Sequence, residues 1–191
     1  MNGIALPPIP GAHRLIVVVG PSGAGKDSLL RGWRASPGVD APRVAQRVIT
    51  RAPDVSETHE AVTPAAFAGL RARGLLATWW QAHGLDYGVR GGELAPLADG
   101  RWVVLNGSRA HLPALRAQAP GLRVVAVSAP AHVLASRLAA RGREGAPARA
   151  QRLAREIGPP LDADLAIVND GDLRHAVDAL SHWWRGQHGR D

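Results

Sequence analysis

The sequence contains no cysteine, which excludes disulfide bonds, thiolate metal ligands and cysteine nucleophiles together. No apolar run approaches the roughly 20 residues that a membrane-spanning helix requires. Residues 1–13 are rich in proline and lack the basic start and apolar block that would predict a signal peptide. A cysteine-free chain is also compatible with a reducing compartment. From these absences we expect a soluble, cytoplasmic protein without a membrane partner.

Lysine is almost absent as well. The 23 basic residues include a single lysine, Lys26, and stand against 16 acidic residues, for a formal net charge of +7. In a chain that uses arginine wherever any cation suffices, one retained lysine indicates a position that needs a compact ammonium group. The arginines leave two interpretations open: a solvated basic surface, or a polyanionic ligand such as a nucleotide, a sugar phosphate or a nucleic acid.

The length of 191 residues and the hydrophobic content of 46% predict one globular domain, residues 1–191, with a single core. Short apolar runs alternate with segments of helical periodicity, which favours an α/β fold with a parallel sheet flanked by helices. The predicted strands are residues 14–19, 44–49, 76–81, 102–105, 124–128 and 165–168. The predicted helices are residues 27–35, 67–70 (opened by Pro64), 111–117, 131–140, 148–156 and 173–184 (capped by Asp172), with a break at 141–147.

A glycine-rich segment, GPSGAGKD at residues 20–27, follows the first predicted strand and opens the first predicted helix. Its G-x-x-x-x-G-K spacing is that of a Walker A phosphate loop, in which backbone N–H groups and the helix N-terminus bind phosphate oxygens. We expect Lys26 to reach the β- and γ-phosphates of ATP and to be catalytic. The residues expected to bind the nucleotide are Gly20, Pro21, Ser22, Gly23, Ala24, Gly25, Lys26, Asp27 and Ser28.

Asp27 stands where the motif usually has the serine or threonine whose hydroxyl binds Mg²⁺. One interpretation is that its carboxylate approaches the metal, directly or through water. That interpretation is favoured by Asn106, which follows a predicted strand where a Walker B acid would otherwise stand. The other interpretation is that the carboxylate only stabilises the positive end of the helix dipole. Both stay open, and Asp27 is the candidate metal ligand.

Further motifs occur in the order typical of the guanylate kinase superfamily, which the chain resembles. They are GPSGAGKD, ITR at residues 49–51, HGLDYG at 83–88, RLAARG at 137–142 and VND at 168–170. More specifically, the chain resembles the ribose 1,5-bisphosphate phosphokinase family of the carbon–phosphorus lyase pathway, over segments that span nearly its whole length: residues 20–30, 47–51, 56–59, 80–89, 104–113 and 141–144. The block VLNGSRAHLP at 104–113 is the most diagnostic, because guanylate kinases differ there, and an aspartate after the loop lysine belongs to that family's pattern.

The resemblance implies a P-loop kinase of guanylate kinase-like fold that uses ATP and Mg²⁺, with an acceptor-binding region at about residues 45–95 and a lid at about 137–155. It implies that Arg137, Arg141 and Arg152 act on the transferring phosphoryl group and that Asn169 lies near the adenine. For Asn169, a turn-forming Asn-Asp-Gly sequence is the alternative.

On the acceptor side the resemblance implies a set of mostly cationic and hydroxyl-bearing residues. For Arg47 and Arg109, solvation at the protein surface is the alternative interpretation. The set is Arg47, Arg51, His59, Tyr87, Asn106, Ser108 and Arg109.

The implied reaction moves the γ-phosphoryl group of ATP onto the 1-phosphate of ribose 1,5-bisphosphate and gives ADP and 5-phosphoribosyl 1-diphosphate. Neutral Asn106 and Ser108 replace the acidic residues with which guanylate kinases bind guanine, which favours the sugar bisphosphate. The attacking phosphate oxygen is already ionised at neutral pH, so no histidine is needed as a base.

Two alternatives compete with this function. A guanylate kinase or other nucleoside monophosphate kinase would share everything except the acceptor. A non-catalytic nucleic-acid or scaffold module is disfavoured, because the phosphate loop is intact and no aromatic platform lies among clustered arginines. The expected partners are therefore small molecules, not nucleic acid, and a homodimer is compatible with the sequence.

Overall fold

The computed structural model describes residues 6–52, 58–140 and 162–188. The chain divides into two compact units, Met1–Val17 with Pro42–Arg123 and Val18–Ala41 with Val124–Asp191. Hydrogen bonds join the strands into a five-stranded sheet of order β2-β7-β1-β8-β9 and a four-stranded sheet of order β4-β3-β6-β5. Within the described ranges, none of the helices is both long enough and apolar enough to cross a membrane.

The five-stranded sheet contains parallel strand pairs, as the alternation of apolar runs and helices predicts. Strand β2 (Arg43–Val44) runs parallel to β7 (Val103–Asn106), and β8 (Arg123–Ser128) runs parallel to β9 (Leu165–Val168). All residues of β1 (Leu15–Val19) are buried, as expected of an aliphatic strand that is covered on both faces. The α/β class with a parallel sheet flanked by helices is confirmed.

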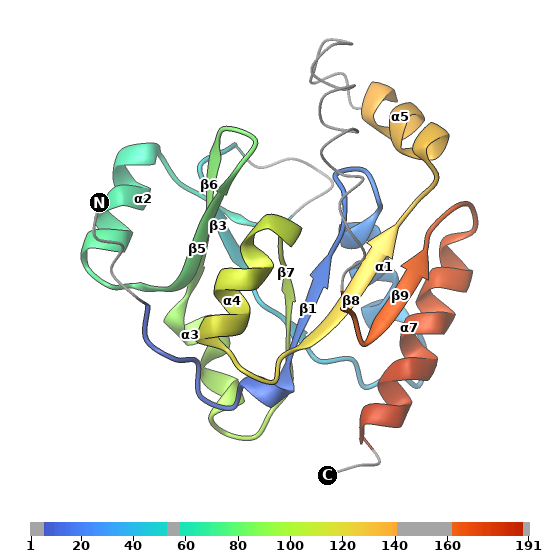
Figure 1. Cartoon of the computed structure of the whole chain (residues 1–191), viewed down its shortest axis with the longest axis horizontal. Helices are drawn as coiled ribbons and strands as arrows, with labels where there is room; N and C mark the ends of the chain where they lie inside the picture. Colours follow the sequence, from blue (N-terminus) through green and yellow to red (C-terminus); the bar gives the residue numbers. More distant parts are fainter. Residues whose placement is uncertain (1–5, 53–57, 141–161, 189–191) are drawn as a thin grey trace. The chain divides into compact units, whose positions relative to one another are not determined.

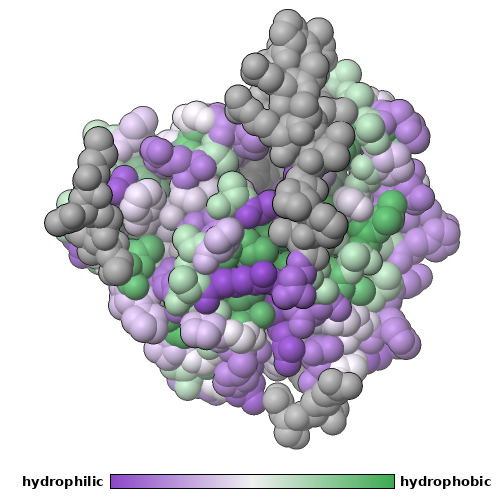
Figure 2. Space-filling model, in the orientation of Figure 1, coloured by the Kyte–Doolittle hydropathy of each residue, from purple (hydrophilic) through white to green (hydrophobic). Residues whose placement is uncertain are grey.

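In the second unit, helix α1 (Lys26–Ala35) packs against helix α7 (Leu173–His188) (Figure 1). Trp33 and Trp184 meet edge to face at this contact, with ring centroids 5.8 Å apart. Asp172 caps α7 as predicted, because its carboxylate accepts the N–H of Arg174 at 2.9 Å. The outer side of α7 is hydrophilic (Figure 2), which leaves its apolar side for the core. Helix α5 (Ala131–Ala140) follows β8 in the same unit.

In the first unit, β6 (Leu85–Arg90) runs antiparallel to β3 (Arg47–Ile49) and to β5 (Leu76–Ala82), and β4 (Glu60–Ala61) pairs with β3 in parallel. Helix α2 (Pro64–Ala72) begins after Thr63, whose hydroxyl accepts a backbone N–H of the first turn, and has Pro64 at its start as predicted. Helix α2 lies beside the sheet (Figure 1). One side of the sheet shares a buried apolar cluster with α2, formed by Val48, Phe67, Leu70 and Leu76.

The remaining described elements of the first unit are short. They are the 3-10 turns η1 (Ala12–Arg14), η2 (Ala95–Leu97) and η3 (Arg109–His111), and the helices α3 (Gly91–Leu94) and α4 (Leu112–Gln118).

Most predicted strands and helices are confirmed to within a few residues, with one correction. The single strand predicted at residues 44–49 is wrong: β2 and β3 belong to different sheets. The N–H of Ala45 still bonds the carbonyl of Val104 at 2.8 Å, whereas that of Gln46 bonds the carboxylate of Glu93 at 2.9 Å, so the ladder ends there. Strand β6 was not predicted. The predicted break at 141–147 and helix at 148–156 lie outside the described residues.

Candidate functional site

The phosphate-loop segment joins β1 to α1, and two of its glycines are required by their surroundings. A Cβ on Gly20, directly after β1, would overlap the carbonyl oxygen of Val127 in β8. Gly25, the residue before α1, has φ of 87° in the left-handed region, and a Cβ there would overlap the side-chain amide of Asn169. Only glycine fits these close backbone approaches. The spacing of the motif is therefore explained by the local packing.

Lys26, the first residue of α1, folds back over the loop. Its ammonium group donates to the carbonyl of Gly20 at 2.7 Å and to that of Pro21 at 2.9 Å. Two convergent carbonyls suit a compact ammonium group better than the planar fork of an arginine. The structure thus provides a local reason why this position has the only lysine, and it places that lysine at the loop.

Asn169 and Arg137 hold the backbone of the same loop. Asn169 follows β9, is 3% exposed, and donates from Nδ2 to the carbonyl of Ala24 at 2.8 Å. Arg137, on α5, donates from Nη1 to the carbonyl of Gly23 at 3.3 Å and to that of Asn169 at 3.2 Å. The structure therefore brings two residues from distant parts of the sequence to the predicted nucleotide site. Their catalytic and binding roles remain predictions.

The candidate metal ligand, Asp27, lies in the first turn of α1 and is half-buried, and Ser28 next to it is exposed. A carboxylate at this position is stabilised by the helix dipole. Among the described residues, no group of three or more His, Cys, Asp or Glu side chains is arranged to hold a metal ion. Oxygens of a bound nucleotide usually supply ligands to Mg²⁺ at phosphate sites, and the metal role of Asp27 stays a prediction.

In the first unit, two candidate acceptor residues lie on one face of the four-stranded sheet. Arg47 is paired with Val89, and Ile49 with Tyr87, across β3 and β6. Residues directly opposite each other share a face, and successive residues alternate between faces. Arg47 and Tyr87 therefore lie on the face opposite to Val48, which belongs to the apolar cluster shared with α2.

Strand β7 and the turn after it add further candidates. Asn106 ends β7, is 2% exposed, and its carbonyl accepts from Nη1 of Arg47 at 3.4 Å. Arg47 is itself 9% exposed, which excludes surface solvation as the explanation for this arginine. Ser108 precedes η3 and Arg109 begins it, and both are half-buried.

Arg51 and His59, the two remaining acceptor candidates, are connected by a hydrogen bond. The Nε2 atom of His59 lies 3.0 Å from the carbonyl oxygen of Arg51, and His59 is 7% exposed. A carbonyl oxygen only accepts hydrogen bonds, so Nε2 carries a proton in this contact.

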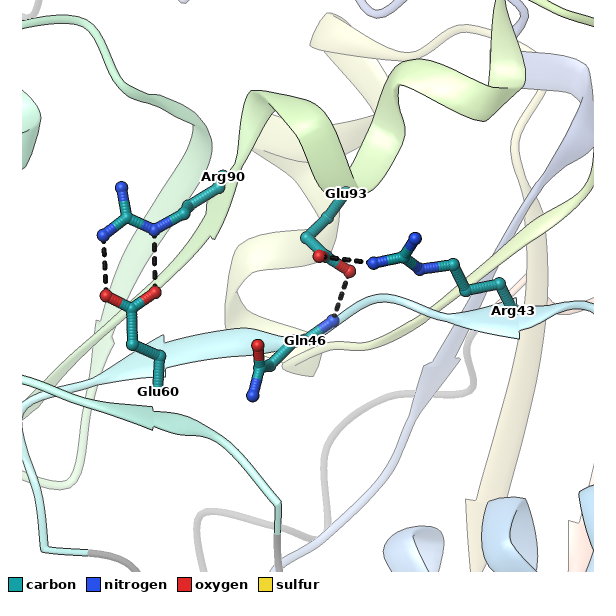
Figure 3. A network of polar contacts seen from close by, with 5 residues as sticks. All are labelled: Arg43, Gln46, Glu60, Arg90 and Glu93. Carbon is teal, nitrogen blue, oxygen red and sulfur yellow. Dashed lines mark hydrogen bonds and ion pairs between the residues drawn. The ribbon is translucent and has the colours of Figure 1, made fainter.

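Acidic side chains of the first unit are engaged by neighbouring donors (Figure 3). The guanidinium of Arg90 donates two hydrogen bonds to the carboxylate of Glu60, at 2.6 and 2.7 Å. These hydrogen bonds hold the pKa of Glu60 below its ordinary value. Glu93 accepts from Arg43 at 2.6 Å and from the N–H of Gln46 at 2.9 Å. The other two carboxylates described in this unit accept from Gln81 (to Asp86) and from Arg101 (to Asp99).

Sequence reasoning missed two residues that support this face. Trp80 stacks on Tyr87 with ring centroids 5.4 Å apart, and His111 also stacks on Trp80, with ring centroids 4.9 Å apart. The available signal was the alternation of faces in β5, which separates Trp80 from Trp79, but it does not say what covers each face. Two predicted site residues, Arg141 and Arg152, lie outside the described residues.

Comparisons with known proteins agree on one family. The chain is 48% identical over 171 residues to the ribose 1,5-bisphosphate phosphokinase PhnN of Burkholderia pseudomallei, covering 86% of this chain and 91% of that protein. It is 49% identical over 175 residues to the PhnN of Laribacter hongkongensis, covering 89% of this chain and 42% of that protein. It is 43% identical over 173 residues to a bifunctional ribose 1,5-bisphosphokinase-thymidine phosphorylase of Azorhizobium caulinodans, covering 88% of this chain and 25% of that protein. The chain thus spans most of the first relative and less than half of the other two. No protein-family model matches the chain.

Among solved structures, the fold is similar to that of a guanylate kinase from Anaplasma phagocytophilum, with a TM-score of 0.64 and 20% sequence identity, covering 96% of this chain and 87% of that one. This likeness supports the P-loop fold that the phosphate-loop motif predicts.

Proposed function

The chain belongs to the ribose 1,5-bisphosphate phosphokinase family, and from this premise we propose that it transfers the γ-phosphoryl group of ATP to the 1-phosphate of ribose 1,5-bisphosphate. An oxygen of the 1-phosphate attacks the γ-phosphorus, and the bond from that phosphorus to the β–γ bridging oxygen breaks. The products are ADP and 5-phosphoribosyl 1-diphosphate. The attacking oxygen is ionised at neutral pH, so the reaction needs positioning and charge compensation and not a base.

On the donor side, the proposal assigns the loop and Lys26 to the phosphates of ATP. The ammonium group of Lys26 now contacts loop carbonyls, and bound β- and γ-phosphates would draw it away from them by their greater charge. Asn169 fits a place beside the nucleotide. Its buried Oδ1 has no hydrogen-bond partner in the described part of the chain, and an amino group of a bound nucleotide would satisfy it.

Mg²⁺ fits this loop as a companion of ATP. Asp27 would hold it, directly or through water, together with phosphate oxygens. When bound, the metal would compensate charge on the β- and γ-phosphates. We propose that Arg137, which already lies against the loop, adds positive charge beside the transferring group, as would Arg141 and Arg152.

The choice of acceptor depends on the acidic side chains of the first unit. A guanine ring requires carboxylates that accept from its ring N–H and its amino group. The four carboxylates described in this unit are instead engaged by arginine, glutamine or backbone donors. A sugar with two phosphates needs cations and hydroxyl-binding groups, and these are what the candidate acceptor set offers: Arg47, Arg51, His59, Tyr87, Asn106, Ser108 and Arg109.

An acceptor panel tests the proposal. Initial rates of ADP release are measured with magnesium and ATP for ribose 1,5-bisphosphate, GMP and AMP at equal concentrations, with Lys26→Ala as the inactive control. We expect turnover with the sugar bisphosphate, and ³¹P NMR should show a new diphosphate signal. Faster turnover with GMP would establish the nucleoside monophosphate kinase instead.

A further inference from the structure

Three aromatic rings, those of Tyr87, Trp80 and His111, stack on the candidate acceptor face of the four-stranded sheet. The rings of Trp80 and Tyr87 are inclined by 8° and those of Trp80 and His111 by 17°, so all three are nearly parallel. Register produces the first contact, because Trp80 of β5 is directly opposite Tyr87 of β6. Turn η3 supplies the second contact, because His111 is its last residue and stacks on Trp80.

His111, the last ring of the stack, is held to the same sheet by a hydrogen bond. Thr78, fully buried on β5, makes a hydrogen bond of 2.8 Å between its hydroxyl and Nε2 of His111. Thr78 precedes Trp80 by two residues, so both side chains lie on one face of β5. Trp80 is 6% exposed and His111 is 9% exposed. Burial lowers the pKa of His111 to about 4, so its ring is neutral where the enzyme would work.

We propose that Trp80 and His111 are positioning residues that hold the Tyr87 ring in one orientation for the acceptor phosphate. The inference rests on the proposed function, in which Tyr87 binds the acceptor. A tyrosine on a strand has several rotamers, and ordering it on binding weakens affinity. A ring already held against Trp80, which itself stacks on His111, avoids that cost. Trp80 and His111 would therefore contribute to acceptor affinity without touching the acceptor.

The test compares two adjacent tryptophans. Trp80→Leu removes the stack, whereas Trp79→Leu makes the same change on the opposite face, where the guanidinium of Arg71 lies 3.5 Å from the Trp79 ring centre. We expect Trp80→Leu to raise the acceptor KM by roughly threefold to tenfold and to leave the ATP KM unchanged. Trp79→Leu should leave both constants unchanged, and Trp80→Phe, which retains a ring, should recover most of the acceptor affinity.

A double-mutant cycle separates positioning from general damage. In the Tyr87→Phe background, where the hydroxyl is already missing, Trp80→Leu should raise the acceptor KM much less than in the wild type. An equal rise in both backgrounds would overturn the inference, as would equal effects on the two substrates. If Trp80→Leu does not fold, His111→Gln, which removes the ring stacked on Trp80, enters the cycle in its place.

The cycle uses whichever acceptor of the panel the wild-type enzyme phosphorylates fastest. Rejection of ribose 1,5-bisphosphate would therefore overturn the proposed function while this test still decides the role of Trp80 and His111.

Discussion

Replacement of Gly25 by alanine should lower the free energy of unfolding, because it disturbs the phosphate loop in two ways. The left-handed φ of 87° costs a residue with a Cβ about 1–2 kcal/mol. The new methyl group would also overlap Nδ2 of Asn169 and displace it from the carbonyl of Ala24, a buried hydrogen bond of 2.8 Å. Leaving such a group unsatisfied costs about 1–3 kcal/mol. We expect the free energy of unfolding to fall by about 2–5 kcal/mol.

Urea denaturation of the wild type, Gly25→Ala, Asn169→Ala and the double variant measures this coupling. With the Asn169 amide removed, the methyl group keeps only an ordinary van der Waals contact with Nη1 of Arg137 at 3.7 Å, so Gly25→Ala should then cost only the backbone strain of about 1–2 kcal/mol. Gly69→Ala, inside α2 with open space around it, is the matched control and should raise stability by about 0.5–1 kcal/mol. If Gly25→Ala costs the same with and without the amide, the contact with Asn169 is not the reason that this position has glycine.

Four further predictions address the two sites. Lys26→Arg should lower kcat by roughly a hundredfold or more in the ADP-release assay, because a planar fork cannot replace the ammonium group, and near-normal turnover would contradict this. Arg51→Ala should raise the acceptor KM by about tenfold to a hundredfold but not the ATP KM, and equal effects would show that the acceptor assignment is wrong. Asp27→Asn should need more magnesium for half-maximal activity if the carboxylate holds the metal, whereas superimposable magnesium titrations of variant and wild type would favour a purely helix-stabilising role. Burial lowers the pKa of His111 from 6.5 to about 4, so between pH 6.5 and pH 4 the unfolded chain binds more protons than the folded chain. The free energy of unfolding should accordingly fall by up to about 3 kcal/mol as the pH is lowered from 6.5 to 4, and His111→Gln should flatten this dependence in urea melts at each pH.

The phosphate loop could be predicted from the sequence because its signals are local. A run of aliphatic residues predicts the buried strand β1, and the G-x-x-x-x-G-K spacing that follows is visible in the local sequence, although the contacts that require Gly20 and Gly25 come from Val127 and Asn169, far along the chain. Helix α7 could be predicted for the same reason, because its cap, Asp172, and its amphipathic periodicity can both be recognised in the local sequence. In each case the residues that define the element also carry its signal.

The acceptor face could not be predicted in the same way, because its strands are short and depend on distant partners. Strand β3 has three residues and β4 has two, too few for a period of two to be visible. Strand β6 contains Gly88, which β-propensity disfavours, and a Cβ at this position would press against the side chains of Leu76 and Phe67. The register that places Arg47 and Tyr87 on one face follows from these tertiary contacts and not from the local sequence.

The chemistry of the proposed reaction does not say where the histidines lie in the fold. A reaction whose nucleophile is already ionised needs no base, and this removed every histidine from the list of bases. In the structure, His111 stacks on Trp80 and is hydrogen-bonded to the hydroxyl of Thr78. A ring with a pKa of about 4 is a poor base at neutral pH and a stable neutral surface for stacking. Part of the sequence block at residues 104–113 therefore serves packing, because His111 stacks on Trp80, and no search for acid–base residues would have found this.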